Sequence, residues 1–397
     1  MRISTAGMFR ASLGQMQELQ SALTRTQEQI ASGKRLLAPS DDAIGAARSI
    51  ELRELSSRIE QYNRNGNLAQ SRLSVQEQAL ASAGDLLQRA RELAVQASNG
   101  TQSNETRSFI ATEVRQLKEQ MVQLANTRDT TGRYLFSGYS DKVQPFSATS
   151  DGAVYNGDEG QRLVEIAEGR RIADGDSGAR VFQRIPQGNG TFATAVVAGN
   201  SGSGIIDSGA VTDPAGWNRD SYTISFVADD AWEVTDGSGA TVASGGFEPG
   251  SSIEFGGVVV SITGSPAAGD EFTVEPSRDQ SVFATLDRLA DALERPTTND
   301  ATRAELSNDL NSSMSDLDRA IGNLLDVRAT VGSRLAAIED QRDANDGFAI
   351  TVEQTISEIE DLDYTEALTR LAEQINSLEA AQKSFVRIQS LSLFSVL

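Results

Sequence analysis

The sequence predicts a mainly α-helical protein with a β-rich domain inserted between two helical arms. From Met1 to about Asn126 the chain has one proline and a steady supply of Leu, Ala, Gln, Glu and Arg, which favour helix. Residues 145–276 contain 22 of the 34 glycines and both tryptophans. Helical composition returns from about Ser281 to Leu397, so the two ends resemble each other more than either resembles the middle.

The first helical segment carries a narrow apolar stripe. Phe9, Met16, Leu23 and Ile30 follow one another at intervals of seven residues. This interval keeps side chains on one side of an α-helix and is typical of coiled coils. Because polar residues flank the stripe, we expect it to form a seam against another helix.

A joint interrupts the helical sequence at "SGKRLLAPSDDAIGAA", residues 32–47. Gly33 can adopt the left-handed conformation that ends a helix, and Pro39 lies in the turn that follows. Ser40 is a good N-cap for the next helix, with Asp41 and Asp42 adding negative charge at its first turn. We therefore interpret the two aspartates as capping residues rather than a catalytic pair, and the stretch as a joint between two helical layers.

Apolar residues continue at helical spacing on both sides of the insert. A helix from Ala43 to about Ser98 would be roughly 80 Å long, and such rods suit assembly along an axis. The series are Leu52, Leu55, Ile59 and Tyr62; Leu73, Leu80, Leu87 and Ala94; Ile110, Val114, Leu117, Met121 and Leu124; Leu310, Met314, Leu317, Ile321, Leu324, Val331, Leu335 and Ile338; and Leu368, Leu371, Ile375, Leu378 and Phe385.

The inserted segment is expected to form short strands. The runs 221–227, 258–263 and 271–276 are rich in β-favouring residues and are bounded by Gly, Asp and Pro. Trp217 and Trp232 could stack on sugars, but in a β domain they more often pack in the core or in turns.

Composition argues against several classes of function. The chain has no cysteine and no histidine, which removes thiolate and imidazole metal sites and histidine-dependent triads. "DGDSG" (174–178) begins like a calcium loop, but Ile185 stands where a bidentate Glu is needed. The net charge of −21 opposes binding to nucleic acid or anionic membranes. We therefore predict no catalytic residues, cofactor or metal.

Membrane insertion and a cleaved leader are also not expected. No segment approaches the roughly 20 apolar residues needed to span a bilayer. The opening "MRISTAGMFRASLGQ" lacks the apolar stretch of a secretory signal.

Several motifs together resemble the flagellar hook-associated protein 3 family of the flagellin superfamily. They include "RISTAGMF", "ASGKRLLAPSDDAIGAAR", "LANTRDTTGRYLFSGY", "AGDEFTVEPSRDQSVFATL" and "VGSRLAAIEDQRDAND". The joint and "LEAAQKSFVRIQSLSLF" are shared in looser form with flagellin. The resemblance covers the whole chain and matches least well between about 177 and 265.

The resemblance implies a tubular assembly built from layers. Residues 1–40 and 350–397 would pair as an antiparallel coiled coil in the inner layer, 41–144 and 277–349 would form a long-helix bundle, and 145–276 would be a small outer β domain. The terminal seams would be buried only in the assembly, so that Leu371 and Leu378 face solvent in the free subunit. The residues expected at the assembly interface are Phe9, Met16, Leu23, Ile30, Leu368, Leu371, Ile375, Leu378 and Phe385.

The family further implies a structural role at the junction between hook and filament. The expected partners are other copies of the chain in a ring, hook-associated protein 1 on the hook side, flagellin on the filament side, and an export chaperone at the carboxyl-terminal helix. The protein would be secreted by the flagellar type III apparatus without a cleaved signal peptide. Two alternatives stay open: a flagellin-type filament subunit, and an enzyme or carbohydrate-binding module carried on a helical stalk.

Overall fold

The computed structural model describes residues 5–150 and 152–394, with side chains for 7–150 and 152–387. The outermost residues of the predicted terminal layer, 1–4 and 395–397, lie outside the described residues. The predicted fold class, mainly α with a β-rich middle, is confirmed. The α-helices are α1 (Thr5–Ser32), α2 (Ala43–Ala97), α3 (Asn104–Ala125), α4 (Val282–Glu294), α5 (Asp300–Glu360) and α6 (Tyr364–Phe394).

The chain divides into two compact units. The terminal unit contains residues 1–64 and 341–397, and the central unit contains residues 65–340. Helices α2 and α5 each contribute residues to both units. The three-layer division concerns how copies pack in an assembly, and it stays a prediction.

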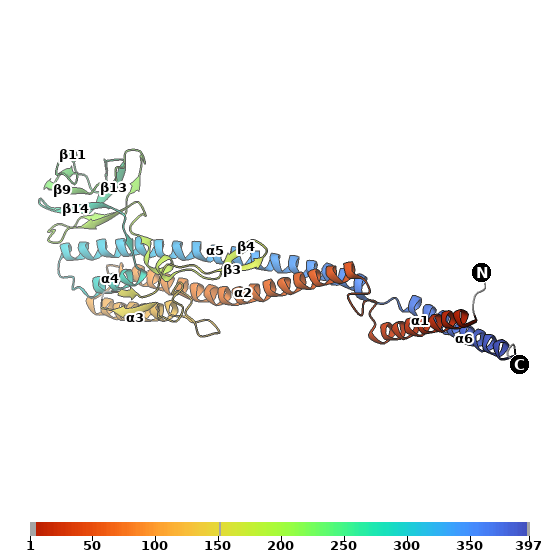
Figure 1. Cartoon of the computed structure of the whole chain (residues 1–397). Helices are drawn as coiled ribbons and strands as arrows, with labels where there is room; N and C mark the ends of the chain where they lie inside the picture. The colour runs from red at the N-terminus through yellow and green to blue at the C-terminus, as the bar shows by residue number, and fades with distance from the viewer. Residues whose placement is uncertain (1–4, 151, 395–397) are drawn as a thin grey trace. The chain divides into compact units, whose positions relative to one another are not determined.

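In the terminal unit, α1 and α6 pack side by side (Figure 1). Gly33, directly after α1, is hydrogen-bonded to Leu362, two residues before α6. At the other end of the pair, the rings of Phe9 and Phe385 stack with their centroids 4.8 Å apart. The helices are therefore antiparallel and stay side by side over about 24 residues.

The helices of the central unit share one apolar core. The predicted series Leu73, Leu80, Leu87 and Ala94 is fully buried on α2, and Val114 is fully buried on α3. Alanines lie between these leucines and permit close helix approach. On α5 the core is formed by Leu310, Leu317, Leu324, Val331 and Ile338.

Aromatic side chains join the loops of the central unit to this core. The rings of Phe136, Phe146, Phe182 and Phe283 pack with centroid separations of 5.0–6.0 Å. The short strands here are β1 (Phe146–Thr149), β2 (Gly152–Tyr155), β3 (Leu163–Ala167), β4 (Arg170–Ala173), β5 (Ile185–Pro186) and β15 (Asp279–Gln280), with the π-helix η1 at Ala179–Gln183.

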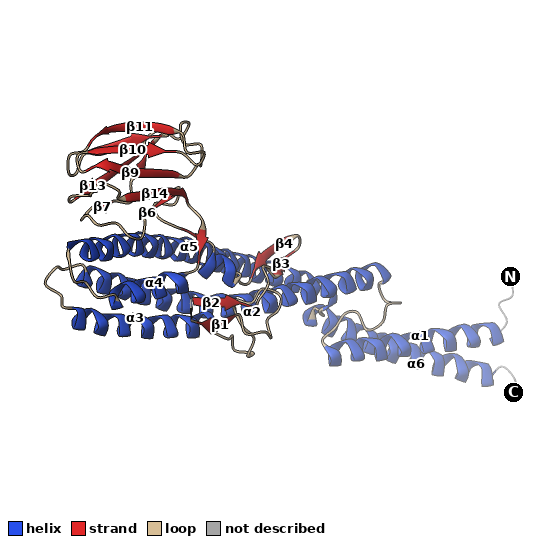
Figure 2. Cartoon of the chain, turned by 90° about the vertical axis from the view of Figure 1, so that its left-hand side faces the viewer, coloured by secondary structure: helices blue, strands red, loops and turns tan. Residues whose placement is uncertain are grey.

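The inserted β domain has a core of its own. A five-stranded antiparallel sheet has the order β11-β10-β9-β14-β6, and a second sheet has the order β12-β13-β7, with β8 also pairing with β13 (Figure 2). The strands are β6 (Phe192–Val196), β7 (Ile205–Ile206), β8 (Ala210–Val211), β9 (Tyr222–Ala228), β10 (Ala231–Thr235), β11 (Thr241–Gly246), β12 (Ser252–Phe255), β13 (Val258–Thr263) and β14 (Glu271–Pro276).

The strands predicted at 221–227, 258–263 and 271–276 correspond to β9, β13 and β14. Trp217 and Trp232 are half-buried and pack against the core of the β domain. Trp232 also donates its indole N–H to the carbonyl of Gly246. These contacts favour the packing interpretation of both tryptophans over a sugar-stacking role.

Candidate assembly interface

The joint between α1 and α2 is built from local hydrogen bonds. Gly33 ends α1 with φ +70°, and its amide donates to the carbonyl of Gln29 at 2.9 Å. The positive φ favours glycine, and a Cβ at this position would make a tight contact, 3.0 Å from the hydroxyl of Tyr364. The predicted role of Gly33 in ending the first helix is confirmed.

The cap of α2 differs from the prediction. The helix begins at Ala43, and Asp42 accepts hydrogen bonds from the amide of Gly45 through its carboxylate and of Ala46 through its carbonyl, both at 2.8 Å. Asp42 is therefore the N-cap, and the expectation that Ser40 caps this helix was wrong. The helix starts three residues after Ser40, whose hydroxyl cannot reach its first free amides.

Asp41 closes the loop before α2. Its carboxylate accepts from the amides of Leu37 and Ala38 at 3.1 Å and pairs with Arg25 of α1. The hydrogen bond from Ala38, with those from Leu37 and Arg25, lowers the pKa of Asp41 against the opposing effect of burial. Pro39 lies exposed at the turn. The two aspartates thus have separate structural roles, Asp41 in the loop and Asp42 at the start of α2.

A second chain crossing, between α5 and α6, lies against this joint. The Leu362 amide donates to the Gly33 carbonyl at 3.0 Å, and the Arg35 amide donates to the Glu360 carbonyl at 2.7 Å. Lys34 and Asp361 pair between these bonds as an antiparallel β-bridge. A short backbone ladder therefore joins the two crossings at the base of the α1–α6 pair.

Glu360 is a central residue of this crossing that sequence analysis did not identify. Its carboxylate is 9% exposed and accepts from Lys34 Nζ at 2.8 Å, from Arg53 Nη2 at 2.5 Å and from the Ser49 hydroxyl. Burial acts to raise the pKa of Glu360, but the hydrogen bonds from Lys34, Ser49 and Arg53 outweigh it and lower the pKa to about 2. We call residues 33–35 and 360–362, with Ser49 and Arg53, the clasp.

The seam of α6 toward α1 follows a heptad pattern. Its more buried positions alternate at intervals of four and three residues, as in a coiled coil. Because α1 is the helix that packs on α6, these positions face α1. They are Ala367, Leu371, Gln374, Leu378, Ala381 and Phe385.

Leu371 and Leu378 are thus half-buried within a single chain. The expectation that they face solvent in the free subunit was wrong, because the heptads of the two chain ends complement each other. On α1, Met16, Leu23 and Ile30 are also half-buried, whereas Phe9 remains 41% exposed although it stacks on Phe385.

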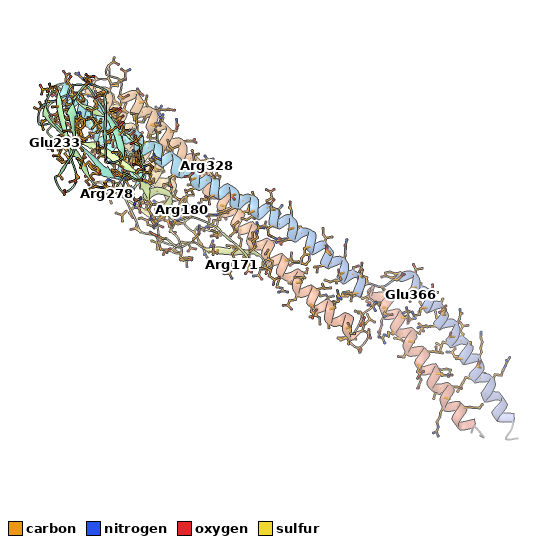
Figure 3. The ribbon with its side chains drawn as sticks, turned by 90° about the horizontal axis from the view of Figure 1, so that it is seen from above. Arg171, Arg180, Glu233, Arg278, Arg328 and Glu366 are labelled. Atoms are coloured by element: carbon orange, nitrogen blue, oxygen red, sulfur yellow. The ribbon has the colours of Figure 1, made fainter. Side chains whose placement is uncertain are left out.

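Two predicted interface residues lie outside this seam. Leu368 is 53% exposed and Ile375 is 40% exposed, and both fall between the heptad positions that face α1. Tyr364 and Val386 are exposed on the same helix. Nearby, Glu366 lies in the first turn of α6 (Figure 3), where negative charge is favoured, and pairs with Arg370. One apolar face of α6 is therefore uncovered in the single chain.

A further apolar surface lies along the first turns of α2. An open groove of about 790 Å³ is lined by the apolar residues Ala43, Ile44, Ala47, Leu52 and Leu55 and by the charged residues Arg48, Glu51, Glu54 and Arg58. Ile44 is 83% exposed. The terminal unit thus carries uncovered apolar side chains on α2 as well as on α6.

The described residues contain no candidate metal site and no helix that could span a membrane. Across 5–150 and 152–394, no cluster of acidic side chains is arranged to hold a metal ion, and none of the helices is apolar enough over a sufficient length to cross a bilayer. Asp176 of "DGDSG" is fully buried, and Arg334, Arg180 and Gln76 bind its carboxylate at 2.8–3.1 Å. This aspartate is a structural ion-pair residue of the central unit.

The paired terminal helices, the helical core and the inserted β domain together define a structural protein of the flagellin superfamily. Residues 3–141 match the bacterial flagellin N-terminal helical region, and residues 196–276 match the D2-like domain of flagellar hook-associated protein 1.

The similarity to solved and characterised relatives extends over most of the chain. FlgL of Xanthomonas campestris is 37% identical with a TM-score of 0.73, covering 77% of this chain and 99% of that structure. Hook-associated protein 3 of Legionella pneumophila is 32% identical with a TM-score of 0.74, covering 78% and 98%. Flagellar hook-associated protein 3 of Escherichia coli K12 is 25% identical over 100% of this chain and 99% of its own length. The chain belongs to the flagellar hook-associated protein 3 family.

Proposed function

We propose that this protein forms the ring that joins the hook to the filament, by coiled-coil self-assembly, and that the ring is the platform on which flagellin polymerises. Membership of the family gives it a structural role in the flagellum. The similarity to a hook-associated protein 3 over the full length, against a flagellin match limited to residues 3–141, favours the junction over a filament subunit.

The uncovered apolar face of the terminal unit carries this proposal. Leu368 and Ile375 remain exposed after α1 and α6 have paired, and Ile44 is exposed on α2. Burying an exposed aliphatic side chain is worth about 1.5–3 kcal/mol, so several such side chains in each copy supply a substantial driving force for association. We expect neighbouring copies to cover this face, with 1–40 and 350–397 as the inner layer, 41–144 and 277–349 as the middle layer and 145–276 facing outward.

The proposed partners follow from the position of the ring. Hook-associated protein 1 would contact it on the hook side and flagellin on the filament side, and an export chaperone would cover the apolar face of α6 before assembly. Residues 196–276 match a domain of hook-associated protein 1, and residues 3–141 match the helical region of flagellin. These matches support an assembly in which subunits with related folds stack on one another. The subunit would be secreted by the type III apparatus without a cleaved signal peptide.

No enzymatic activity is proposed, because the relatives are structural proteins of the flagellum. The carbohydrate-binding alternative loses its main support, since both tryptophans pack on the core of the β domain.

Deletion of the gene, followed by electron microscopy, tests the junction assignment. Cells without the protein should build hooks, lack attached filaments and release flagellin monomers into the medium. Normal filaments on the deleted cells would refute it.

Complementation with substituted chains tests the interface. The pair Leu368→Asp and Ile375→Asp places two charges on the uncovered face and should give a folded, secreted subunit that does not join hook–basal bodies. The matched pair Thr369→Asp and Asn376→Asp adds the same charge at exposed polar positions one residue along and should assemble. Equal incorporation of both double variants would show that this face is not the interface. Secretion is measured separately in culture supernatants, because the chaperone is expected to use the same face.

A further inference from the structure

The heptad contacts between α1 and α6 do not by themselves fix the register, that is, how far the two helices are shifted along each other. A slip of α6 by seven residues would put Leu371 in the place of Leu378, and Leu378 in the place of Phe385. Each exchange leaves a large apolar residue in the seam, so the slipped pair would be nearly as well packed. The register therefore needs a determinant besides the heptads.

The buried polar residues of α1 do not supply that determinant. Thr26 and Gln29 are buried on this helix. The Thr26 hydroxyl donates to the carbonyl of Ala22, and Gln29 Nε2 donates to the carbonyl of Arg35 at 2.6 Å. Both bonds stay within residues 22–35 and would survive a slip of α6.

We propose that the clasp sets the register of the terminal helix pair, and that Glu360 is its positioning residue. The carboxylate joins three parts of the chain that are far apart in sequence: the end of α5, the crossing at Lys34, and α2 at Ser49 and Arg53. It holds the backbone ladder in which Leu362 lies opposite Gly33. The position of Leu362 along the helix pair in turn fixes where α6 starts relative to α1.

The two ends of the pair agree with this assignment. From Gly33 to Phe9 the chain runs 24 residues, and from Leu362 to Phe385 it runs 23. At 1.5 Å per residue the helices travel about 36 and 34 Å from the clasp, and the two phenylalanine rings then meet. The alignment at the base thus accounts for the contact at the far end. The inference concerns the single chain and does not depend on the proposed function.

The absence of cysteine from the sequence permits a direct test on the full-length protein. Gln27→Cys on α1 and Gln382→Cys on α6, both exposed, can carry spin labels for a distance measurement by pulsed electron resonance. The two labels lie at different positions along the axis of the helix pair. A slip of one heptad therefore changes their separation along this axis by about 10 Å. The parent chain should give one narrow distance distribution.

Glu360→Gln should add a second population to the distance distribution, displaced by such a slip. The double variant Lys34→Gln and Arg53→Gln removes the positive partners of Glu360 and should give the same second population. Glu358→Gln removes a charge from an exposed position on the same helix and should leave the distribution unchanged. Phe385→Leu weakens the far end of the pair, keeps the clasp and should keep one register.

Four results would overturn the proposal. The first is a broad distribution in the parent chain, and the second is a distribution for Glu360→Gln that equals that of Glu358→Gln. The third is loss of helix by circular dichroism in Glu360→Gln, which would make the clasp a requirement for pairing rather than for register. A slip caused by Phe385→Leu would assign the register to the aromatic contact instead.

Discussion

Acidification should remove the stabilisation that Glu360 gives to the terminal unit. The carboxylate has a pKa of about 2 in the folded chain, against 4.5 for an unperturbed glutamate. Because the folded value lies below the unfolded one, the stabilisation is fully present above about pH 5 and is lost as the pH falls toward 2. Glu360→Gln should therefore be destabilised at neutral pH and should approach the parent protein in acid.

The size of the effect follows from this difference in pKa. A difference of about 2.5 corresponds to about 3.5 kcal/mol, at roughly 1.4 kcal/mol for each unit of pKa. Lys34 and Arg53 are about half exposed, and solvent screens their charges, so we take this value as an upper bound. We expect Glu360→Gln to lower the free energy of unfolding of the terminal unit by about 1–2 kcal/mol at pH 7.

Urea unfolding at several pH values between 2 and 7 measures the difference. Circular dichroism at 222 nm follows the helices, whereas tryptophan fluorescence follows only the β domain, since both tryptophans lie there. The dichroism transition should shift in Glu360→Gln and the fluorescence transition should not. Glu358→Gln should match the parent at every pH. A deficit of Glu360→Gln that is as large at pH 2.5 as at pH 7 would show that the charge of Glu360 is not its cause.

Four further variants test the seam and the joint in the isolated chain. Leu371→Asp combined with Leu378→Asp should destabilise the helix pair by at least about 2 kcal/mol for each charge, seen as lost ellipticity at 222 nm, and unchanged helix content would mean that this seam does not hold α6. Gly33→Ala should cost about 1–2 kcal/mol in thermal unfolding because a residue at φ +70° is strained, and a neutral result would contradict the observed turn. Asp42→Ala should cost about 1 kcal/mol in urea unfolding and Ser40→Ala almost nothing, and the reverse order would restore Ser40 as the cap.

Much of the fold is predictable because it depends on local patterns. The heptads of α2 and α5 identify residues that prove to be buried, such as Leu80 and Leu317, since one helix face needs no knowledge of its partner. The strands β13 and β14 coincide with runs of β-favouring residues. Gly33 is recognisable as a helix end because its requirement for positive φ is a property of a single residue.

The faces of α6 show where this reasoning fails. By size alone, Leu368, Leu371, Ile375 and Leu378 form a regular series at intervals of three and four residues, which predicts one seam. The structure instead combines Leu371 and Leu378 with small or polar residues such as Ala367, and it leaves Leu368 and Ile375 outside. Small residues let two helices approach closely. A pattern that considers only large side chains does not identify such positions.

Glu360 could not be found by any local rule. The sequence contains 56 acidic residues, and Glu360 differs from its exposed neighbour Glu358 only in what the fold brings to it. Its partner Lys34 is 326 positions away, and Ser49 and Arg53 come from a third segment. The fold brings these groups together from the end of α5, from the crossing after α1 and from α2.

The two apolar stripes of α6 adjoin each other, and this arrangement separates folding from assembly. Leu368 and Leu371 are three residues apart and therefore about 60° apart around the helix, while Leu371 and Ile375 are about 40° apart. Leu368 and Ile375 lie on the same side of Leu371, so the three form an apolar arc about 60° wide, of which α1 covers the edge at Leu371. A helix that is half covered by its own chain keeps its shape and still has a surface for a second partner. Charges in the seam toward α1 should therefore damage the subunit itself, whereas charges on the uncovered stripe should leave the subunit intact and prevent only its association.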